Sequence, residues 1–219
     1  MLRTAFLLLA LITSPLLAQP EDSLAGRLDG NYYVSPRGTY RIAIPVLPEL
    51  GGVVSDTDKV VTFQDNFSIY ISIGVFAQDA SQRWELSTRG PKDYLAYFLG
   101  NFVMPDFEQA FPGSQVESIV YSPTLFNGAL IAYTLLPRGS MFRGKRTLLG
   151  VEPVPVVAKR GNLIFVRNSS IYVISTELAE RETERSTYKK TVAEENEILR
   201  TRLLDVVRKL EFARPDTTP

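Results

Sequence analysis

The segment 163–177 constrains the fold of this chain more than any other. Its sequence, LIFVRNSSIYVISTE, has two runs rich in Ile, Val, Phe and Tyr on either side of Asn168, Ser169 and Ser170. β-Branched and aromatic residues favour strands, and a short polar interruption between two such runs is typical of a β-hairpin. Because both runs are almost wholly apolar, we predict that these strands lie in the middle of a sheet.

Further strands are predicted on both sides of this hairpin. The segment 31–45 has the pattern of two short strands around a Ser-Pro-Arg-Gly turn, and 60–63 with 67–76 has the pattern of a second hairpin. In 67–76, apolar residues alternate with Ser68, Tyr70, Ser72 and Gly74. Such alternation is typical of an antiparallel strand with one buried and one partly polar face. The remaining strand predictions are 115–121, 129–136 and 154–158.

Two helices are predicted to cover this sheet. Pro91 suits a first helical position, so we predict a helix over 91–111 with a stop or kink at Pro105. Thr191 and Glu194 have the spacing of a capping box, which places the start of a helix over 191–212. The face of this helix expected to lie on the sheet consists of Leu199, Leu203, Val206, Val207 and Leu210. The charged segment 177–190 before it is predicted to be a solvated connector or a frayed extension of the helix, and not a binding site. Sheet and helices together predict an α+β fold with a central antiparallel sheet.

The composition excludes several classes of function. The 219 residues include 24 basic and 24 acidic side chains, so no strong charge favours nucleic acid as a partner. The chain has no cysteine and no histidine, which excludes disulfides, thiol and imidazole catalysis, and metal sites that need those ligands. We therefore predict no catalytic residue, no cofactor and no metal site.

Carboxylates remain the alternative source of chemistry. A hydrolase of the carboxylate type would need acids that converge, and the candidates Glu85, Glu108 and Glu117 share no recognisable spacing. Asp56 and Asp58 lie on one loop, but the other oxygen ligands of a calcium loop are missing. We interpret this pair as part of a solvated turn.

The N-terminus has the features of a targeting signal. Arg3 precedes an apolar run over 5–12, and Ala18 supplies a small residue for cleavage. A transmembrane helix would need about 20 apolar residues, and Thr13, Ser14 and Pro15 end this run early. We predict a secretory signal peptide at 1–18, a flexible segment at 19–30, a single globular domain at 31–213 and a disordered tail at 214–219. The predicted location is periplasmic or secreted, with no transmembrane span after cleavage.

The loop over 138–150 is the candidate contact surface. Its sequence, RGSMFRGKRTLLG, contains four basic residues, three glycines and no acid. Gly-rich basic loops can bind anions, but a solvated hairpin tip has the same composition, and both readings stay open. The predicted partner-binding residues are Arg138, Phe142, Arg143, Lys145 and Arg146, with Tyr70 as a weaker candidate.

Several stretches resemble the PsbP-like family of exported domains. They are the opening YYVSPRGTYRIAIP, the hairpin LIFVRNSSIYVIST and the closing VVRKLEF, and the resemblance covers most of 32–212. It implies an α/β/α sandwich that serves as a non-enzymatic accessory or binding module. The basic loop and the connector at 177–190 depart from the photosynthetic members, and the histidine that some members use for metals is missing. Photosystem binding and manganese or calcium handling are therefore not carried over, and no functional residue is transferred.

The function expected from these observations is a soluble, exported, non-enzymatic binding or accessory module of the cell envelope. Its expected partner is a protein or an envelope polymer. The alternative is an envelope hydrolase that uses carboxylates.

Overall fold

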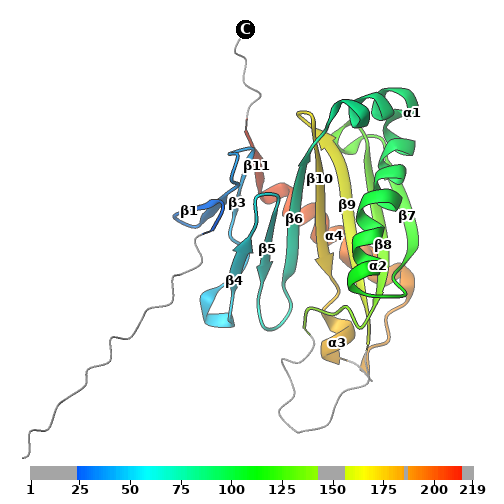
Figure 1. Ribbon diagram of the computed structural model, residues 1–219. Helices are drawn as coiled ribbons and strands as arrows, with labels where there is room; N and C mark the ends of the chain where they lie inside the picture. Colours follow the sequence, from blue (N-terminus) through cyan, green and yellow to red (C-terminus); the bar gives the residue numbers. More distant parts are fainter. Residues whose placement is uncertain (1–23, 143–155, 185–186, 214–219) are drawn as a thin grey trace, which may run out of the picture.

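The computed structural model describes residues 24–142, 156–184 and 187–213 (Figure 1). The predicted signal peptide, the predicted tail at 214–219 and the basic residues Arg143, Lys145 and Arg146 lie outside the described residues. In the part that is described, no helix combines the length and the apolar character that crossing a membrane requires.

Seven antiparallel strands form the main sheet, in the order β4-β5-β6-β10-β9-β8-β7 (Figure 1). The predicted hairpin is β9 and β10, and it lies in the middle, between β6 and β8. The strand predicted at 154–158 is not separate, because its residues Val157 and Ala158 begin β9. The bounds are β4 Val53–Asp56, β5 Val60–Gln64, β6 Tyr70–Ala77, β7 Gln115–Ser122, β8 Ala129–Pro137, β9 Val157–Arg167 and β10 Ser170–Glu177.

Helices cover both faces of this sheet, which confirms the α+β class with a central antiparallel sheet. On one face, α1 (Ala80–Phe98), the π-helix η2 (Leu99–Val103) and α2 (Met104–Ala110) form a continuous helical layer. On the other face lies α4 (Val192–Lys209), which begins at the predicted capping box of Thr191 and Glu194. Short helical turns complete the structure at η1 (Pro48–Leu50), η3 (Leu125–Asn127) and α3 (Glu180–Glu184).

The helical layer begins earlier than predicted, although it ends at Ala110, close to the predicted end at residue 111. It begins at Ala80, because the Asp79 side chain accepts the Gln82 N–H and the Gln82 side chain accepts the Asp79 N–H. Gly90 breaks the helix with φ 76° and ψ 164°, a backbone region that only glycine adopts easily, and Pro91 then starts a second segment. Pro105 does not end the helix, because it lies in the first turn of α2, after the wider turns of η2.

A second, four-stranded sheet of order β1-β2-β3-β11 was not predicted. β11 pairs with β3, so the end of the chain is extended where a helix had been predicted to run through residue 212. β1 lies in the segment predicted to be flexible, and it is held because the Asp56 carboxylate accepts hydrogen bonds from the Ala25 N–H, the Gly26 N–H and the Tyr33 hydroxyl. The bounds are β1 Arg27–Asp29, β2 Tyr32–Val34, β3 Tyr40–Ala43 and β11 Leu210–Phe212.

The strands of the main sheet send alternate side chains into two cores. The larger core lies under α4 and the small sheet, where Phe165 stacks on Tyr172 with ring centroids 5.1 Å apart. Leu199 and Leu203 of α4 are fully buried in it. The smaller core lies under α1, where Tyr94, Leu95, Phe98 and Leu99 cover Leu130, Ala132, Ile164, Ile171 and Val173.

Candidate functional site

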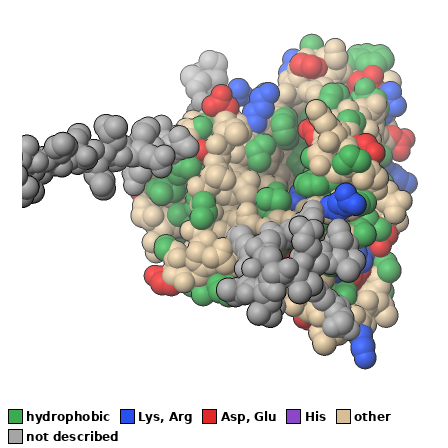
Figure 2. Space-filling model, turned by 60° about the horizontal axis from the view of Figure 1, so that its bottom comes forward, with side chains coloured by type: hydrophobic (Ala, Val, Ile, Leu, Met, Phe, Trp, Pro, Cys, Tyr) green, Lys and Arg blue, Asp and Glu red, His purple; other side chains and the backbone are tan. Residues whose placement is uncertain are grey.

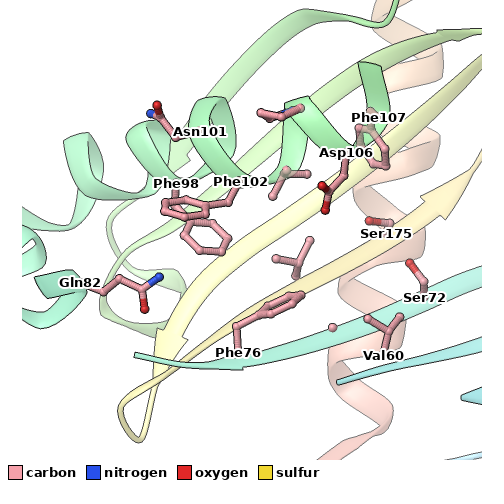
Figure 3. Close-up of a pocket in the computed structure, with 14 residues that line it drawn as sticks. Val60, Ser72, Phe76, Gln82, Phe98, Asn101, Phe102, Asp106, Phe107 and Ser175 are labelled. Carbon is pink, nitrogen blue, oxygen red and sulfur yellow. The ribbon is translucent and has the colours of Figure 1, made fainter. Parts of the chain in front are cut away.

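A pocket of about 390 Å³ lies where the helical layer meets the main sheet (Figure 3). Its floor comes from β5, β6 and β10, and its roof comes from the end of α1, from η2 and from α2. In the space-filling view, hydrophobic side chains gather along a hollow on this face of the molecule (Figure 2). The residues that line the pocket are mainly apolar, with a few polar groups, which is the usual make-up of a small-molecule site.

The floor changes from apolar to polar within the pocket. Gly74 and Val173 are paired neighbours on β6 and β10, and two residues further along Ser72 is paired with Ser175. Gly74 matters because it has no side chain: a Cβ there would lie 2.8 Å from the Phe76 ring. The Phe76 ring can therefore lie over the backbone of Gly74, and no side chain from Gly74 fills the pocket at this point.

Aromatic rings form the roof. Phe98 and Phe102 stack with their centroids 5.1 Å apart, and Phe76 on the floor lies 6.3 Å from Phe98. The π-helix η2 places Phe102 here, and its side chain is 43% exposed. Turns of π-helix occur often at functional sites, because they shift side chains out of the regular helical order.

The polar end of the pocket contains one carboxylate and two hydroxyl groups. Figure 3 shows Asp106 of α2 on the same side of the pocket as Ser72 and Ser175. The Ser175 hydroxyl donates a 2.7 Å hydrogen bond to Asn162, whose amide donates in turn to the Thr134 hydroxyl at 3.1 Å. Because the Ser175 proton is engaged, its oxygen is left as an acceptor.

An ion pair beside the pocket supports α2 and the loop after β8. The Arg160 Nε lies 3.2 Å from Glu177, and the guanidinium lies over the rings of Tyr70, Phe107 and Phe111 at 4.6 to 5.9 Å. Glu177 also accepts hydrogen bonds from the Ser140 hydroxyl and the Met141 N–H. Burial raises the pKa of Glu177, and the positive charge of Arg160 opposes that rise. Because both side chains are engaged in these contacts, we interpret the pair as a structural one that stabilises the packing of α2 and of the loop after β8.

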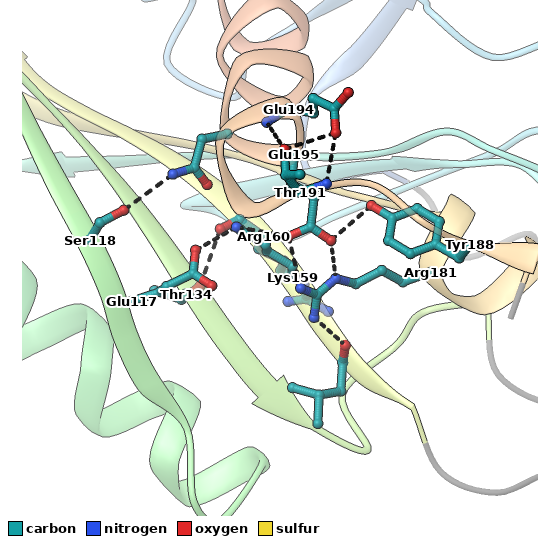
Figure 4. Close-up of polar contacts among 12 residues, drawn as sticks. Glu117, Ser118, Thr134, Lys159, Arg160, Arg181, Tyr188, Thr191, Glu194 and Glu195 are labelled. Carbon is teal, nitrogen blue, oxygen red and sulfur yellow. Dashed lines mark hydrogen bonds and ion pairs between the residues drawn. The ribbon is translucent and has the colours of Figure 1, made fainter. Parts of the chain in front are cut away.

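A second buried polar cluster lies on the opposite face of the sheet (Figure 4). Lys159 is fully buried, and its ammonium forms ion pairs with Glu117 and with Glu195. Glu195 also accepts hydrogen bonds from Arg181 and Tyr188 at 2.7 to 2.8 Å. Burial on its own raises the pKa of Glu195, but these hydrogen bonds outweigh it and lower the pKa to about 2. The cluster attaches the first turn of α4 to β9.

This cluster corrects the prediction of a solvated connector at 177–190. Leu178 and Ala179 are buried beside Glu177, and Arg181 and Tyr188 hold Glu195. The charged sequence misled the prediction because Glu177, Glu180 and Arg181 are paired with residues elsewhere in the chain, while Glu184, Lys189 and Lys190 are exposed as predicted.

The structure separates the predicted contact residues. Arg138 is exposed, with φ 60° at the start of the loop. Phe142 is only 4% exposed and packs with Tyr70 and Ala179, so neither aromatic ring is free to contact a partner in this conformation. The other three predicted residues lie outside the described part of the chain.

The acidic candidates do not come together. Glu85 pairs with Arg89, Glu108 accepts the Gly113 N–H, and Glu117 pairs with Lys159. Asp56 holds the N-terminal segment, as described above. Among the described residues, no group of three or more acidic side chains is placed to hold a metal ion.

Sequence reasoning missed the pocket. Phe98 and Phe102 lie in the helix predicted over 91–111 and were given no role, and on the partly polar face of the strand 67–76 only Tyr70 was considered as a contact. Two features of the sequence could have indicated a site: the small polar residues on one face of β6, and the aromatic residues Phe98 and Phe102 of the helix that covers that face. Asp106, next to Pro105, gave no signal of its own.

No family model matches this sequence, and no curated protein sequence matches it significantly. Among solved structures, the Ran-binding protein Mog1p of Saccharomyces cerevisiae is similar over 87% of this chain and 96% of its own, with 9% identity and a TM-score of 0.47. Cyanobacterial PsbP (CyanoP) from Synechocystis sp. PCC 6803 is similar over 91% of this chain and all of its own, with 10% identity and a TM-score of 0.48. The likeness to Mog1 and PsbP-like structures is one of fold, at low sequence identity.

Proposed function

We propose that this chain is an exported, non-enzymatic binding or accessory module, and that the pocket under η2 and α2 is its binding site. The observation that carries the proposal is the pocket itself: about 390 Å³, aromatic on one side, with hydroxyl groups and a carboxylate at one end. Ligand sites in proteins usually measure about 300–1,000 Å³ and combine an apolar lining with a few oriented polar groups. Export is proposed from the signal-like N-terminus, with the periplasm or the exterior as the location.

The rival proposal, a hydrolase that uses carboxylates, has less support. Glycosidases place two carboxyl groups about 5 to 9.5 Å apart across the bond that they cleave. Of the described residues that line the pocket, Asp106 alone is acidic. The buried acids Glu177 and Glu195 are held by Arg160, Lys159 and Arg181.

A fluorescent apolar probe tests the proposal. Titration of the purified protein with N-phenyl-1-naphthylamine should give a saturable rise in probe emission. Replacing Phe102 by Ala removes one wall of the pocket. The lost aromatic contact should weaken binding by about 10-fold, which corresponds to roughly 1.4 kcal/mol of binding free energy. Phe67→Ala is the matched control, because Phe67 is also a half-exposed phenylalanine and lies outside the pocket.

The control decides where the probe binds. If Phe102→Ala and Phe67→Ala bind the probe as tightly as the unaltered protein, the pocket is not the site. If the emission never saturates, the proposed binding function fails.

A further inference from the structure

The pocket has a negative charge that no described residue balances. Asp106 is the single charged residue among those that line it, and its carboxylate forms no ion pair or hydrogen bond with the part of the chain that is described. The buried cations Arg160 and Lys159 have other partners: Arg160 binds Glu177 and the Gly139 carbonyl, and Lys159 binds Glu195 on the other face of the sheet.

The start of α2 does not neutralise this charge. Free N–H groups at a helix N-terminus attract anions, and Asp106 lies in the first turn of α2. Here, however, α2 continues directly from η2, and the Met104 N–H already donates to the Leu99 carbonyl. Pro105 has no N–H to offer. The carboxylate is therefore free to bind a group that enters the pocket.

The other lining groups favour the same kind of partner. The faces of the Phe76, Phe98, Phe102 and Phe107 rings carry partial negative charge, which attracts cations and repels anions. The Ser175 oxygen is an acceptor, because its proton is donated to Asn162. A ligand group that donates hydrogen bonds and carries positive charge would interact favourably with the carboxylate, with the ring faces and with the Ser175 oxygen.

We propose that the pocket selects organic cations, namely molecules with a flat apolar body and a protonated amine, and that the amine lies between Asp106, Ser72 and Ser175 with the body against the phenylalanine rings. This inference rests on the proposed binding function and specifies its ligand class. The combination of aromatic faces with one unbalanced carboxylate is the chemistry by which proteins recognise ammonium groups.

Three naphthalene probes of matched shape test it. They are 1-naphthylmethylammonium, 1-naphthylmethanol and 1-naphthylacetate, which differ in charge but share the ring. By calorimetry at neutral pH and low salt, the ammonium should bind about 10-fold more tightly than the alcohol, and the acetate should bind most weakly. Raising the salt concentration should reduce the preference for the ammonium, since screening weakens an exposed ion pair.

Asp106→Asn should lower the affinity for the ammonium to that of the alcohol and leave the alcohol unchanged. Asp93→Asn is the control, because it removes the same charge from an exposed position of α1 that does not line the pocket. It should leave the preference for the ammonium intact.

The outcomes separate this inference from the proposed function. Equal binding of the ammonium and the alcohol, or an Asp106→Asn protein that keeps the preference, would overturn the organic-cation inference alone. Stronger binding of the acetate would overturn it as well and would indicate an acid as the ligand. Absence of binding by all three probes, together with failure of the phenylnaphthylamine titration, would overturn the binding function itself.

Discussion

Lys159 lies in the larger core with no exposed surface, between the carboxylates of Glu117 and Glu195. A buried ion pair adds little net stability, but removing one partner leaves charges that are neither solvated nor paired. We expect Lys159→Met to lower the free energy of unfolding by about 3–5 kcal/mol, measured by urea denaturation. Lys59→Met, at an exposed lysine, is the control and should change it by less than about 0.5 kcal/mol. A loss below about 1 kcal/mol for Lys159→Met would contradict the burial of this charge.

Glu195 should make the free energy of unfolding depend on pH in the acidic range. Its pKa in the folded state is about 2, against an ordinary value of 4.5, so the unfolded chain binds a proton first as the pH falls. The stability that the charged carboxylate contributes is therefore complete above pH 4.5 and is lost between about pH 4.5 and 2. Each unit of this pKa difference corresponds to about 1.4 kcal/mol.

The measurement compares unfolding free energies from pH 2 to pH 7 for the unaltered protein and for Glu195→Gln. The glutamine variant should be less stable at neutral pH, and the difference should narrow below pH 4.5. Parallel curves over the whole range would show that Glu195 does not carry this dependence.

Single residues explain why the middle of β9 was hard to predict. Lys159, Arg160 and Asn162 interrupt the apolar pattern. The strand was therefore predicted to begin only at Leu163, whereas β9 begins at Val157. Each of the three is buried because a partner reaches it from another element: Glu195 from α4, Glu177 from β10 and Thr134 from β8. Such pairings depend on the tertiary structure, and no local pattern contains them.

At the scale of elements, α4 lies close against β9 at Gly161. A Cβ at this position would lie 3.1 Å from Leu199 and from Leu203 of the helix. We expect Gly161→Ala to push α4 away from the sheet and to destabilise the protein by about 1–3 kcal/mol, measured as a lower midpoint of thermal or urea unfolding. Gly100→Ala is the control, because a Cβ on Gly100 meets open space. Equal effects of the two substitutions would show that the helix is not packed this closely.

Periodicity and capping predicted most elements. The central hairpin, the strands of 60–76 and 115–136, and the start of α4 follow from alternation, turn residues and the Thr191 capping box. The first half of α1 was missed, because 80–89 is mostly polar and Gly90 separates it from the apolar stripe. β11 was missed because Leu210 and Phe212 continue the helical pattern, and only pairing with β3 makes this segment extended.

At the scale of the whole molecule, the first and the last strands of the described chain belong to the same small sheet. β11 pairs with β3, and the Phe212 ring packs edge-on against Tyr172 with centroids 5.4 Å apart. We expect a chain that ends at Lys209 to lose roughly 3 kcal/mol of stability or more, since Leu210 and Phe212 then leave the core. A chain that ends at Ala213 keeps β11 and should match the full chain in its thermal midpoint. An unchanged midpoint for the shorter chain would show that β11 adds nothing to the core.

The candidate site could be predicted least of all. Its groups come from the segments 60–76, 98–107 and 173–175 and from Gln82, and each of these parts of the chain has an ordinary structural pattern. The pocket arises from how the helical layer lies on the sheet, and that placement depends on the break at Gly90 and on the π-helix η2. Neither the break's geometry nor the π-helix can be read from spacing alone.

The pairing of β3 with β11 also sets a limit on the order of folding. Arg41 and Glu211 are joined across 170 residues, so the small sheet cannot close before residues 210–212 have been synthesised. Contacts of such long sequence separation form slowly, and until they form the core side of β3 stays uncovered along the edge that β11 occupies. Until residues 210–212 are available, the domain therefore remains an open intermediate that chaperones can bind, and the addition of β11 to β3 is the step that closes the small sheet.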